Sequence, residues 1–254
     1  MAESAVEEGK AAVPAKPARS VAAFFSANPL WTFWNTVIGK KIVMAVTGGV
    51  LVLFVIAHVL GNLKIFIGPD AINAYARFLR EVGQPELEYG QVLWCVRIVL
   101  LLCVILHITA AAQLTRMSWQ ARPEGYREKK NLEATIASRT MRWGGLLLIV
   151  FIVFHILHFT LGVVGFEAGQ YIPLDVYHNV LAAFSIWPIS VFYIVSMAAL
   201  CLHLDHGIWS AIQTLGWSTS RNERWLKIVS RVIAIAIFVG FISVPVGVMA
   251  GWVH

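Results

Sequence analysis

The sequence predicts an all-α membrane protein with five transmembrane helices. Of its 254 residues, 58% are hydrophobic and 13% are charged, whereas a soluble domain has about 45–50% apolar and about 25% charged residues. One water-soluble core of ordinary size cannot bury this excess. Five apolar stretches also reach the length of about 20 residues that a helix needs to cross a bilayer. The composition therefore excludes a soluble enzyme, a disordered protein and a nucleic-acid-binding module.

The expected spans cover residues 42–63, 92–114, 144–166, 181–204 and 228–249. Residues 1–36 form a separate unit, because their mixture of charges, alanines and prolines cannot pack a core and lacks the order of a secretory signal. We expect a cytoplasmic tail that leads through an amphipathic segment near residues 24–34 into a transmembrane domain at residues 37–254. The three cysteines lie inside apolar runs without a CxxC pair, so they predict no disulfide framework or zinc knuckle.

The basic residues predict the orientation. If the N-terminus is cytoplasmic, 16 of the 20 lysines and arginines fall on the inner side and only Lys64, Arg77 and Arg80 on the outer side. Arg97 lies just inside the outer end of the second span. Since cytoplasmic loops are enriched in Lys and Arg, we expect a multi-pass protein of the bacterial inner (plasma) membrane, with its N-terminus cytoplasmic and its C-terminus outside.

Two further features concern the outer side. Residues 68–90 carry an amphipathic pattern that predicts a short helix lying against the membrane. Pro188 and Pro245 are expected to bend the fourth and fifth helices.

Histidines are the main polar residues inside the spans. An ionisable side chain at membrane depth is costly and rare, so each is a functional hypothesis. A single one is more often a neutral imidazole hydrogen-bonded to a neighbouring helix, but four spans that each carry one are harder to explain in this way. Six of the eight histidines lie within or at the end of a span: His58, His107, His155, His158, His203 and His206.

The histidines fall at two depths. At about 1.5 Å per residue, His58 and His155 lie about 20–25 Å from the inner ends of their spans, and His107 lies about 14 Å from the inner end of its own. His203 falls in the inner half of the fourth span. The separations repeat, with 49 residues from His58 to His107 and 48 from His155 to His203. This repeat indicates a duplicated helix pair and a four-helix core.

Histidines that face each other from different helices suit a six-coordinate haem, whose axial ligands approach from opposite faces. Residues at i and i+3 share one side of a helix, so neither His155 with His158 nor His203 with His206 can clamp one haem. A zinc site would need further ligands at the same depth, and Asp205, near an inner end, is the only carboxylate in the spans. Two bis-histidine b haems in a bundle of four helices explain the pattern with the fewest assumptions.

A series of motifs then resembles a known family. These motifs are FVIAH ending at His58, NAYARFLR at residues 73–80, RIVLLLCVILH ending at His107, ARPEGY at residues 121–126, SRTM at residues 138–141, FHILHF at residues 154–159 and HLDHGIW at residues 203–209. In their order and spacing they resemble the dihaem cytochrome b membrane anchor of succinate:quinone oxidoreductases. This is the single-anchor, five-helix type of succinate dehydrogenases and fumarate reductases.

The resemblance implies the ligands. It makes His58 and His155 the ligands of the outer haem iron, and His107 and His203 those of the inner haem iron. The family's inner ligand is followed four residues later by a glycine, which favours His203 over His206. Its outer ligand lies ten residues after a glycine, which favours His155, although depth alone slightly favours His158 as the partner of His58.

Three further residues are expected near the haem propionates. His158 and His206 are expected to contact propionates or backbone groups. Arg97 is expected to pair with an outer propionate, and the alternative is that its side chain reaches to the membrane interface.

The resemblance also implies partners and a quinone. A flavoprotein subunit oxidises succinate, an iron–sulfur subunit docks on the cytoplasmic face, and two b haems pass electrons to a quinone, with menaquinone favoured. This chain itself would carry no succinate-site catalysis. The expected quinone site includes Asn73, Tyr75, Arg80 and Glu81, and Glu81 is alternatively a solvated partner of a nearby arginine.

Three other functions remain open. A fumarate reductase would use the same anchor architecture. The cytochrome b anchor of another membrane dehydrogenase also places histidines on several spans, but the ARPEGY and SRTM segments do not belong to it. A haem-free transporter predicts intramembrane carboxylates and broken helices, and the spans show almost none of the former.

Overall fold

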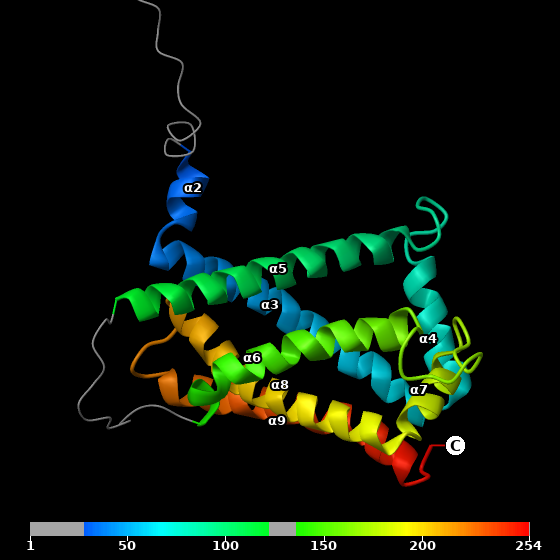
Figure 1. The fold of residues 1–254 in the computed structure, drawn as a ribbon. Helices are drawn as coiled ribbons and strands as arrows, with labels where there is room; N and C mark the ends of the chain where they lie inside the picture. Colours follow the sequence, from blue (N-terminus) through cyan, green and yellow to red (C-terminus); the bar gives the residue numbers. More distant parts are fainter. Residues whose placement is uncertain (1–27, 122–135, 254) are drawn as a thin grey trace, which may run out of the picture.

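The computed structural model describes residues 28–121 and 136–253, and every regular element in these two ranges is helical (Figure 1). Residues 1–27, residues 122–135 and His254 lie outside this description, and with them most of the predicted tail and all but Ala121 of the ARPEGY motif. The elements are α2 (Pro29–Trp34), α3 (Val37–Asn62), η1 (Leu63–Phe66), α4 (Pro69–Glu81), α5 (Gln91–Gln120), α6 (Ile136–His155), η2 (Ile156–Thr160), α7 (Val176–Phe184), α8 (Trp187–Thr214) and α9 (Glu223–Met249).

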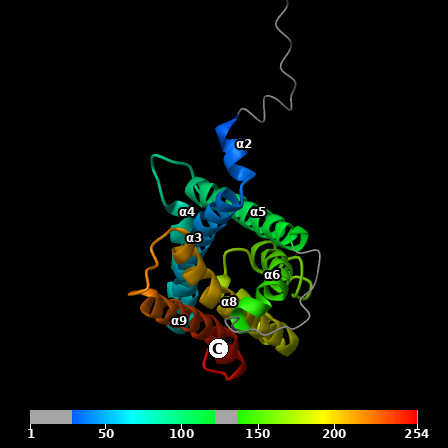
Figure 2. The same cartoon turned by 90° about the vertical axis from the view of Figure 1, so that its left-hand side faces the viewer.

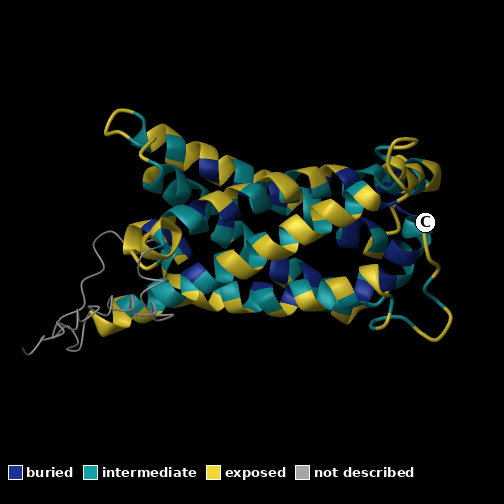
Figure 3. Ribbon diagram, turned by 90° about the horizontal axis from the view of Figure 1, so that it is seen from above, coloured by how far each residue is buried: buried dark blue, intermediate teal, exposed yellow. Residues whose placement is uncertain are grey.

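The five predicted spans are confirmed as five helices that are long and apolar enough to cross a membrane. They are α3 continued by the 3₁₀ turn η1, α5, α6 continued by the π-helical turn η2, α8 and α9. Their outer surfaces are exposed along most of their length (Figure 3). The exposed side chains are mainly large and apolar, as a hydrocarbon environment requires, and include Leu53, Leu101, Val150, Val195 and Val239.

Two boundaries fall short of the predicted spans, whereas all five helices extend beyond their predicted spans at the end of the bundle where α3 begins. The third helix ends at Thr160 rather than at residue 166, because Gly162 and Gly165 adopt positive φ angles of 64° and 75° that leave the helical region. The fourth span begins at Trp187 rather than at residue 181. The prediction that Pro188 bends this helix is wrong: it lies in the first turn, where its missing N–H would have no helical partner. Pro245 does lie inside α9.

The long helices pack as two similar units. In each unit a long helix, a short helix and a second long helix follow one another, first as α3, α4 and α5, then as α6, α7 and α8. The two long helices of each unit pack together, α3 contacts α8 between the units, and α9 lies along α8 and α3 (Figures 1 and 2). This arrangement fits the repeat in the sequence.

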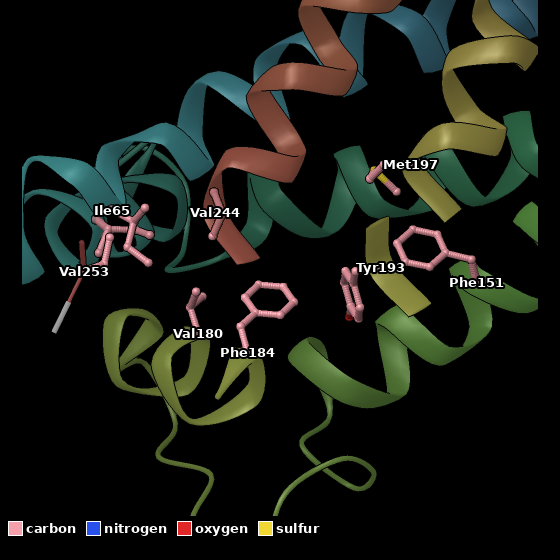
Figure 4. Close-up of a cluster of buried hydrophobic side chains, with 9 residues drawn as sticks. Ile65, Phe151, Val180, Phe184, Tyr193, Met197, Val244 and Val253 are labelled. Carbon is pink, nitrogen blue, oxygen red and sulfur yellow. The ribbon is translucent and has the colours of Figure 1, made fainter. Parts of the chain in front are cut away.

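The short helices α4 and α7 lie together at one end of the bundle, which we call the capped end (Figure 1). The helix predicted within residues 68–90 is confirmed as α4, which buries Ile72 and Ala76. A cluster of apolar side chains from α7, α8, α9 and η1 fills this end, with Phe184 and Tyr193 at its centre (Figure 4). The capped end is therefore a packed part of the fold.

Candidate bis-histidine sites in the bundle

The structure brings His58 of α3 beside His155 at the end of α6. Their ring centroids are 5.8 Å apart and the ring planes form an angle of 78°. Phe54, one turn before His58 on α3, stacks on its ring at 5.3 Å, and Phe241 of α9 contacts it at 5.8 Å. Aromatic side chains therefore hold the first imidazole of this pair in place.

A second pair lies farther from the capped end. The rings of His107 on α5 and His203 on α8 are 6.2 Å apart between centroids. Nδ1 of His107 lies 3.1 Å from the Met44 carbonyl oxygen of α3. A Cβ at Gly48 would lie 3.2 Å from Cε1 of His107, so the glycine lets this ring lie close against α3.

His203 faces open space as well as its partner ring. It lines a cavity of about 240 Å³ together with Thr140, Trp143, Gly144, Leu147, Ala199 and Leu202. Its Nδ1 is buried and has no hydrogen-bond partner among the described residues. An unpaired polar atom in apolar surroundings is costly, and Nε2 of His158 and Nε1 of Trp209 share this state among the described residues.

Both ring separations fit an iron atom between two imidazoles. A metal–nitrogen bond of about 2 Å on each side, plus about 1 Å from nitrogen to ring centre, gives about 6 Å between centroids. The two separations in the structure are 5.8 Å and 6.2 Å. A ligating histidine also tends to hydrogen-bond its second nitrogen to a fixed acceptor, and the Met44 carbonyl provides this for His107. The spacing of both pairs therefore fits a metal between two imidazoles, and His107 has the fixed acceptor as well, whereas Nδ1 of His203 has no partner among the described residues.

The neighbouring histidines have other surroundings. His158 is fully buried, with the rings of Phe159 and Phe166 at 4.3 Å and 4.7 Å and its Nδ1 3.0 Å from the Tyr193 hydroxyl. The partner that the structure places beside His58 is thus His155, and the slight preference of the depth count for His158 finds no support. His206 is half-buried on α8, three residues beyond His203.

Sequence reasoning missed Tyr193. Its side chain is buried and its hydroxyl lies between the two histidines of α6 and η2, 3.2 Å from Nδ1 of His155 and 3.0 Å from Nδ1 of His158. The available signal was a tyrosine in the middle of an apolar span. His178, which lies outside the predicted spans, is in α7 with Nε2 3.1 Å from the Gln170 carbonyl oxygen.

The expected quinone residues do not converge on one described cavity. The side-chain amide nitrogen and oxygen of Asn73 are both hydrogen-bonded, to Asp175 at the start of α7 and to the backbone N–H of Tyr177. Tyr75 packs against Gly61 of α3. Arg80 donates to the carbonyl oxygen of Ala76 within its own helix at 2.6 Å. Glu81, the only carboxylate among these four residues, is exposed at the end of α4.

Arg97 lies near the start of α5. Its guanidinium carbon is 4.9 Å from the ring centroid of Trp94, one turn earlier on the same helix. The Trp94 side chain is 61% exposed. This packing on an exposed ring fits the alternative in which Arg97 reaches to the membrane interface.

Asn73 and Asp175 join α4 to α7. The Asn73 amide donates to the Asp175 carboxylate at 3.0 Å, and its oxygen accepts from the backbone N–H of Tyr177 at 3.1 Å. Asp175 also caps α7 by accepting from the His178 backbone N–H at 3.0 Å. These bonds fix the two short helices to each other.

We expect the capped end to loosen in acid. The His178 backbone N–H, and then the Asn73 amide, lower the pKa of Asp175 below its ordinary value. A lowered pKa in the folded state means that the carboxylate stabilises the fold above the unfolded value of about 3.9, and that this contribution is lost as the pH falls through the folded value. The protection factors for hydrogen exchange of amides in α4 and α7 should therefore fall in acid.

Asp175→Asn supplies the control. In this variant exchange at α4 and α7 should already be faster at neutral pH, and the acid-dependent part of the change should be smaller. Equal pH dependence in both proteins would contradict the role given to Asp175.

The fold and its apolar helices define an all-helical, multi-pass membrane protein. Compared with protein-family models, with curated proteins and with solved structures, the chain matches none. The histidine geometry is therefore the main structural basis for a functional assignment.

Proposed function

We propose that this chain is a dihaem cytochrome b that serves as membrane anchor and electron-transfer subunit of a succinate:quinone oxidoreductase. One observation carries the proposal: four helices contribute two pairs of histidine rings, 5.8 Å and 6.2 Å apart, at two levels of one bundle. The sequence motifs that contain these histidines resemble those of the family, and this resemblance supports the choice of succinate:quinone oxidoreductase. Among the members of this family we favour succinate dehydrogenase over fumarate reductase, because the residues of the motifs resemble that branch more closely.

The residues have assigned roles in this proposal. His58 and His155 bind the outer haem iron, and His107 and His203 bind the inner one. When bound, the two haems supply one-electron transfer between an iron–sulfur partner and a quinone, for which we favour menaquinone. The side chains of α3, α5, α6 and α8 orient the imidazoles and keep water from them.

The proposed orientation puts the flavoprotein and iron–sulfur subunits on the cytoplasmic face. At the end of the bundle opposite the capped end, α3 and α9 begin and α5 and α8 end (Figure 1). Basic residues collect at this end, among them Lys41, Arg116, Arg142, Arg221 and Arg224. Their position supports an inner, cytoplasmic face there and a capped end on the outside of the bacterial inner membrane.

The test is the cofactor content of the purified chain. We expect two haem b per chain, measured as the pyridine haemochrome and as the reduced-minus-oxidised spectrum. A variant in which His58, His107, His155 and His203 are all replaced by leucine should carry none. A wild-type chain without haem would contradict the proposal and favour the transporter.

Co-purification separates the remaining alternatives. Gentle solubilisation should retain a flavoprotein and an iron–sulfur subunit that together oxidise succinate. Retention of a hydrogenase or formate dehydrogenase subunit would assign the chain to another membrane dehydrogenase instead.

A further inference from the structure

The hydroxyl of Tyr193 bridges two histidines that have different surroundings. It lies 3.2 Å from Nδ1 of His155, which faces His58, and 3.0 Å from Nδ1 of His158, which is enclosed by aromatic rings. These two imidazoles are the hydrogen-bond partners that the structure gives this hydroxyl within residues 28–121 and 136–253. Neither Tyr193 nor His158 is a haem ligand in the proposed function.

Rigid packing holds the bridge in place. The Tyr193 ring meets Phe151 and Phe184 edge-on, with centroids 5.1 Å and 5.0 Å away. The Tyr193 side chain is only 6% exposed, and His158 is fully buried. Aromatic rings packed edge-to-face prefer this geometry, so the hydroxyl has little freedom to turn to other partners.

The Tyr193 hydroxyl constrains the protonation of the two imidazoles. A tyrosine hydroxyl carries one proton, so it can donate to only one of the two Nδ1 atoms. If both imidazoles donated to it, its own proton would stay unpaired in an apolar core, which is costly. A hydroxyl that both donates and accepts needs one histidine protonated on Nδ1 and the other protonated on Nε2. Only the histidine protonated on Nδ1 has an Nε2 lone pair free to bind a metal. Nε2 of His158 is buried without a hydrogen-bond partner among the described residues.

We propose that Tyr193 and His158 are positioning residues for the outer haem site. His155 donates its Nδ1 proton to the Tyr193 oxygen, Tyr193 donates its proton to Nδ1 of His158, and Nε2 of His155 is left unprotonated to bind iron. The direction of this chain of hydrogen bonds rests on the proposed function, which makes His155 the ligand. The bridge itself rests on the geometry alone.

A hydrogen bond from the second nitrogen makes an imidazole a stronger donor to its metal, and removing such a partner typically weakens binding about 10–100-fold. A stronger donor favours ferric over ferrous iron. Tyr193→Phe should therefore raise the midpoint potential of the outer haem, or release this haem, while the inner haem keeps its potential.

The experiment is a spectroscopic redox titration of the haem-loaded full chain for the wild type, Tyr193→Phe, His158→Phe and the double variant. His158→Phe should shift the outer potential in the same direction by a smaller amount. The double variant should match Tyr193→Phe, because both residues act through one chain of hydrogen bonds. Additive shifts, equal shifts of both haems, or no shift would each overturn the proposal.

Tyr171→Phe is the matched control. It removes a tyrosine hydroxyl that bonds the Phe159 carbonyl oxygen at 3.2 Å rather than a histidine. Both potentials should stay at their wild-type values in this variant. A shift as large as that of Tyr193→Phe would point to a general structural effect of losing a hydroxyl near the capped end.

A second measurement does not depend on haem. In the full chain produced without haem and labelled with ¹⁵N-histidine, the nitrogen spectrum should show His155 and His158 in opposite tautomers, each assigned by its replacement with glutamine. Both signals should change in Tyr193→Phe. Unchanged signals would overturn the bridge, whereas changed signals in a chain that never binds haem would overturn the proposed function alone.

Discussion

Replacing His203 by leucine is expected to halve the haem content of the chain, from two haem b to one. His203 contributes one of the two imidazoles of its pair, 6.2 Å from His107, and an apolar side chain there cannot coordinate iron. The lost haem should be the inner one, because the rings of His58 and His155 belong to a separate pair. Haem content, together with the electron paramagnetic resonance spectrum of the remaining haem, measures this outcome.

His206→Leu is the matched control for this variant. His206 is the same residue type on the same helix, one turn beyond His203 and half-buried. This variant should keep two haems. Retention of both haems in His203→Leu, or loss of one in His206→Leu alone, would reassign the inner ligand.

Replacing Gly165 by alanine is expected to lower the free energy of unfolding by about 2–5 kcal/mol. Gly165 has a φ angle of 75°, and a Cβ there would lie 2.8 Å from Cδ2 and Nε2 of the His158 ring. The left-handed conformation costs a residue with a Cβ about 1–2 kcal/mol, and overpacking a well-packed core costs about 1–3 kcal/mol. Equilibrium unfolding in mixed micelles measures the change.

Gly169→Ala separates these two costs. Gly169 has a φ angle of 79°, but a Cβ there would meet no atom within 4 Å. The variant should therefore lose about 1–2 kcal/mol, the conformational cost alone. If both variants lost the same amount, the His158 ring would be able to move aside, and the enclosure described for it would be wrong.

The number of spans was predictable because the cost of exposing apolar side chains to water depends on composition and length. The two levels of histidines were also predictable, since the helical rise converts a residue count into a depth. His58 and His155, which lie 97 residues apart in the chain, meet within 5.8 Å in the structure. Their positions in apolar spans were enough to suggest a histidine pair at this level, but depth alone slightly favoured His158 as the partner of His58, and the family resemblance favoured His155.

The helix ends near the capped end were less predictable. The stretch from residue 181 to 204 is apolar throughout most of its length, yet one helix ends at Phe184 and the next begins at Trp187. Hydropathy indicates which segments prefer an apolar environment, but it does not show whether such a segment forms one helix or two. Pro188 is a typical residue for the first turn of a helix, so it indicated a helix start and not the bend that we expected.

The sequence by itself determined that the chain is helical, that five segments are suited to a bilayer, and which histidines lie at matched depths, because these properties follow from local composition and from the fixed rise of a helix. Only the tertiary structure decided that His155 rather than His158 lies beside His58, and that Tyr193 joins these two histidines of α6 and η2. Two residues three positions apart differ little in depth. Their roles depend on which neighbouring helix each side chain faces, and only the packing of α6 against α8, and of α8 against α3, fixes that direction.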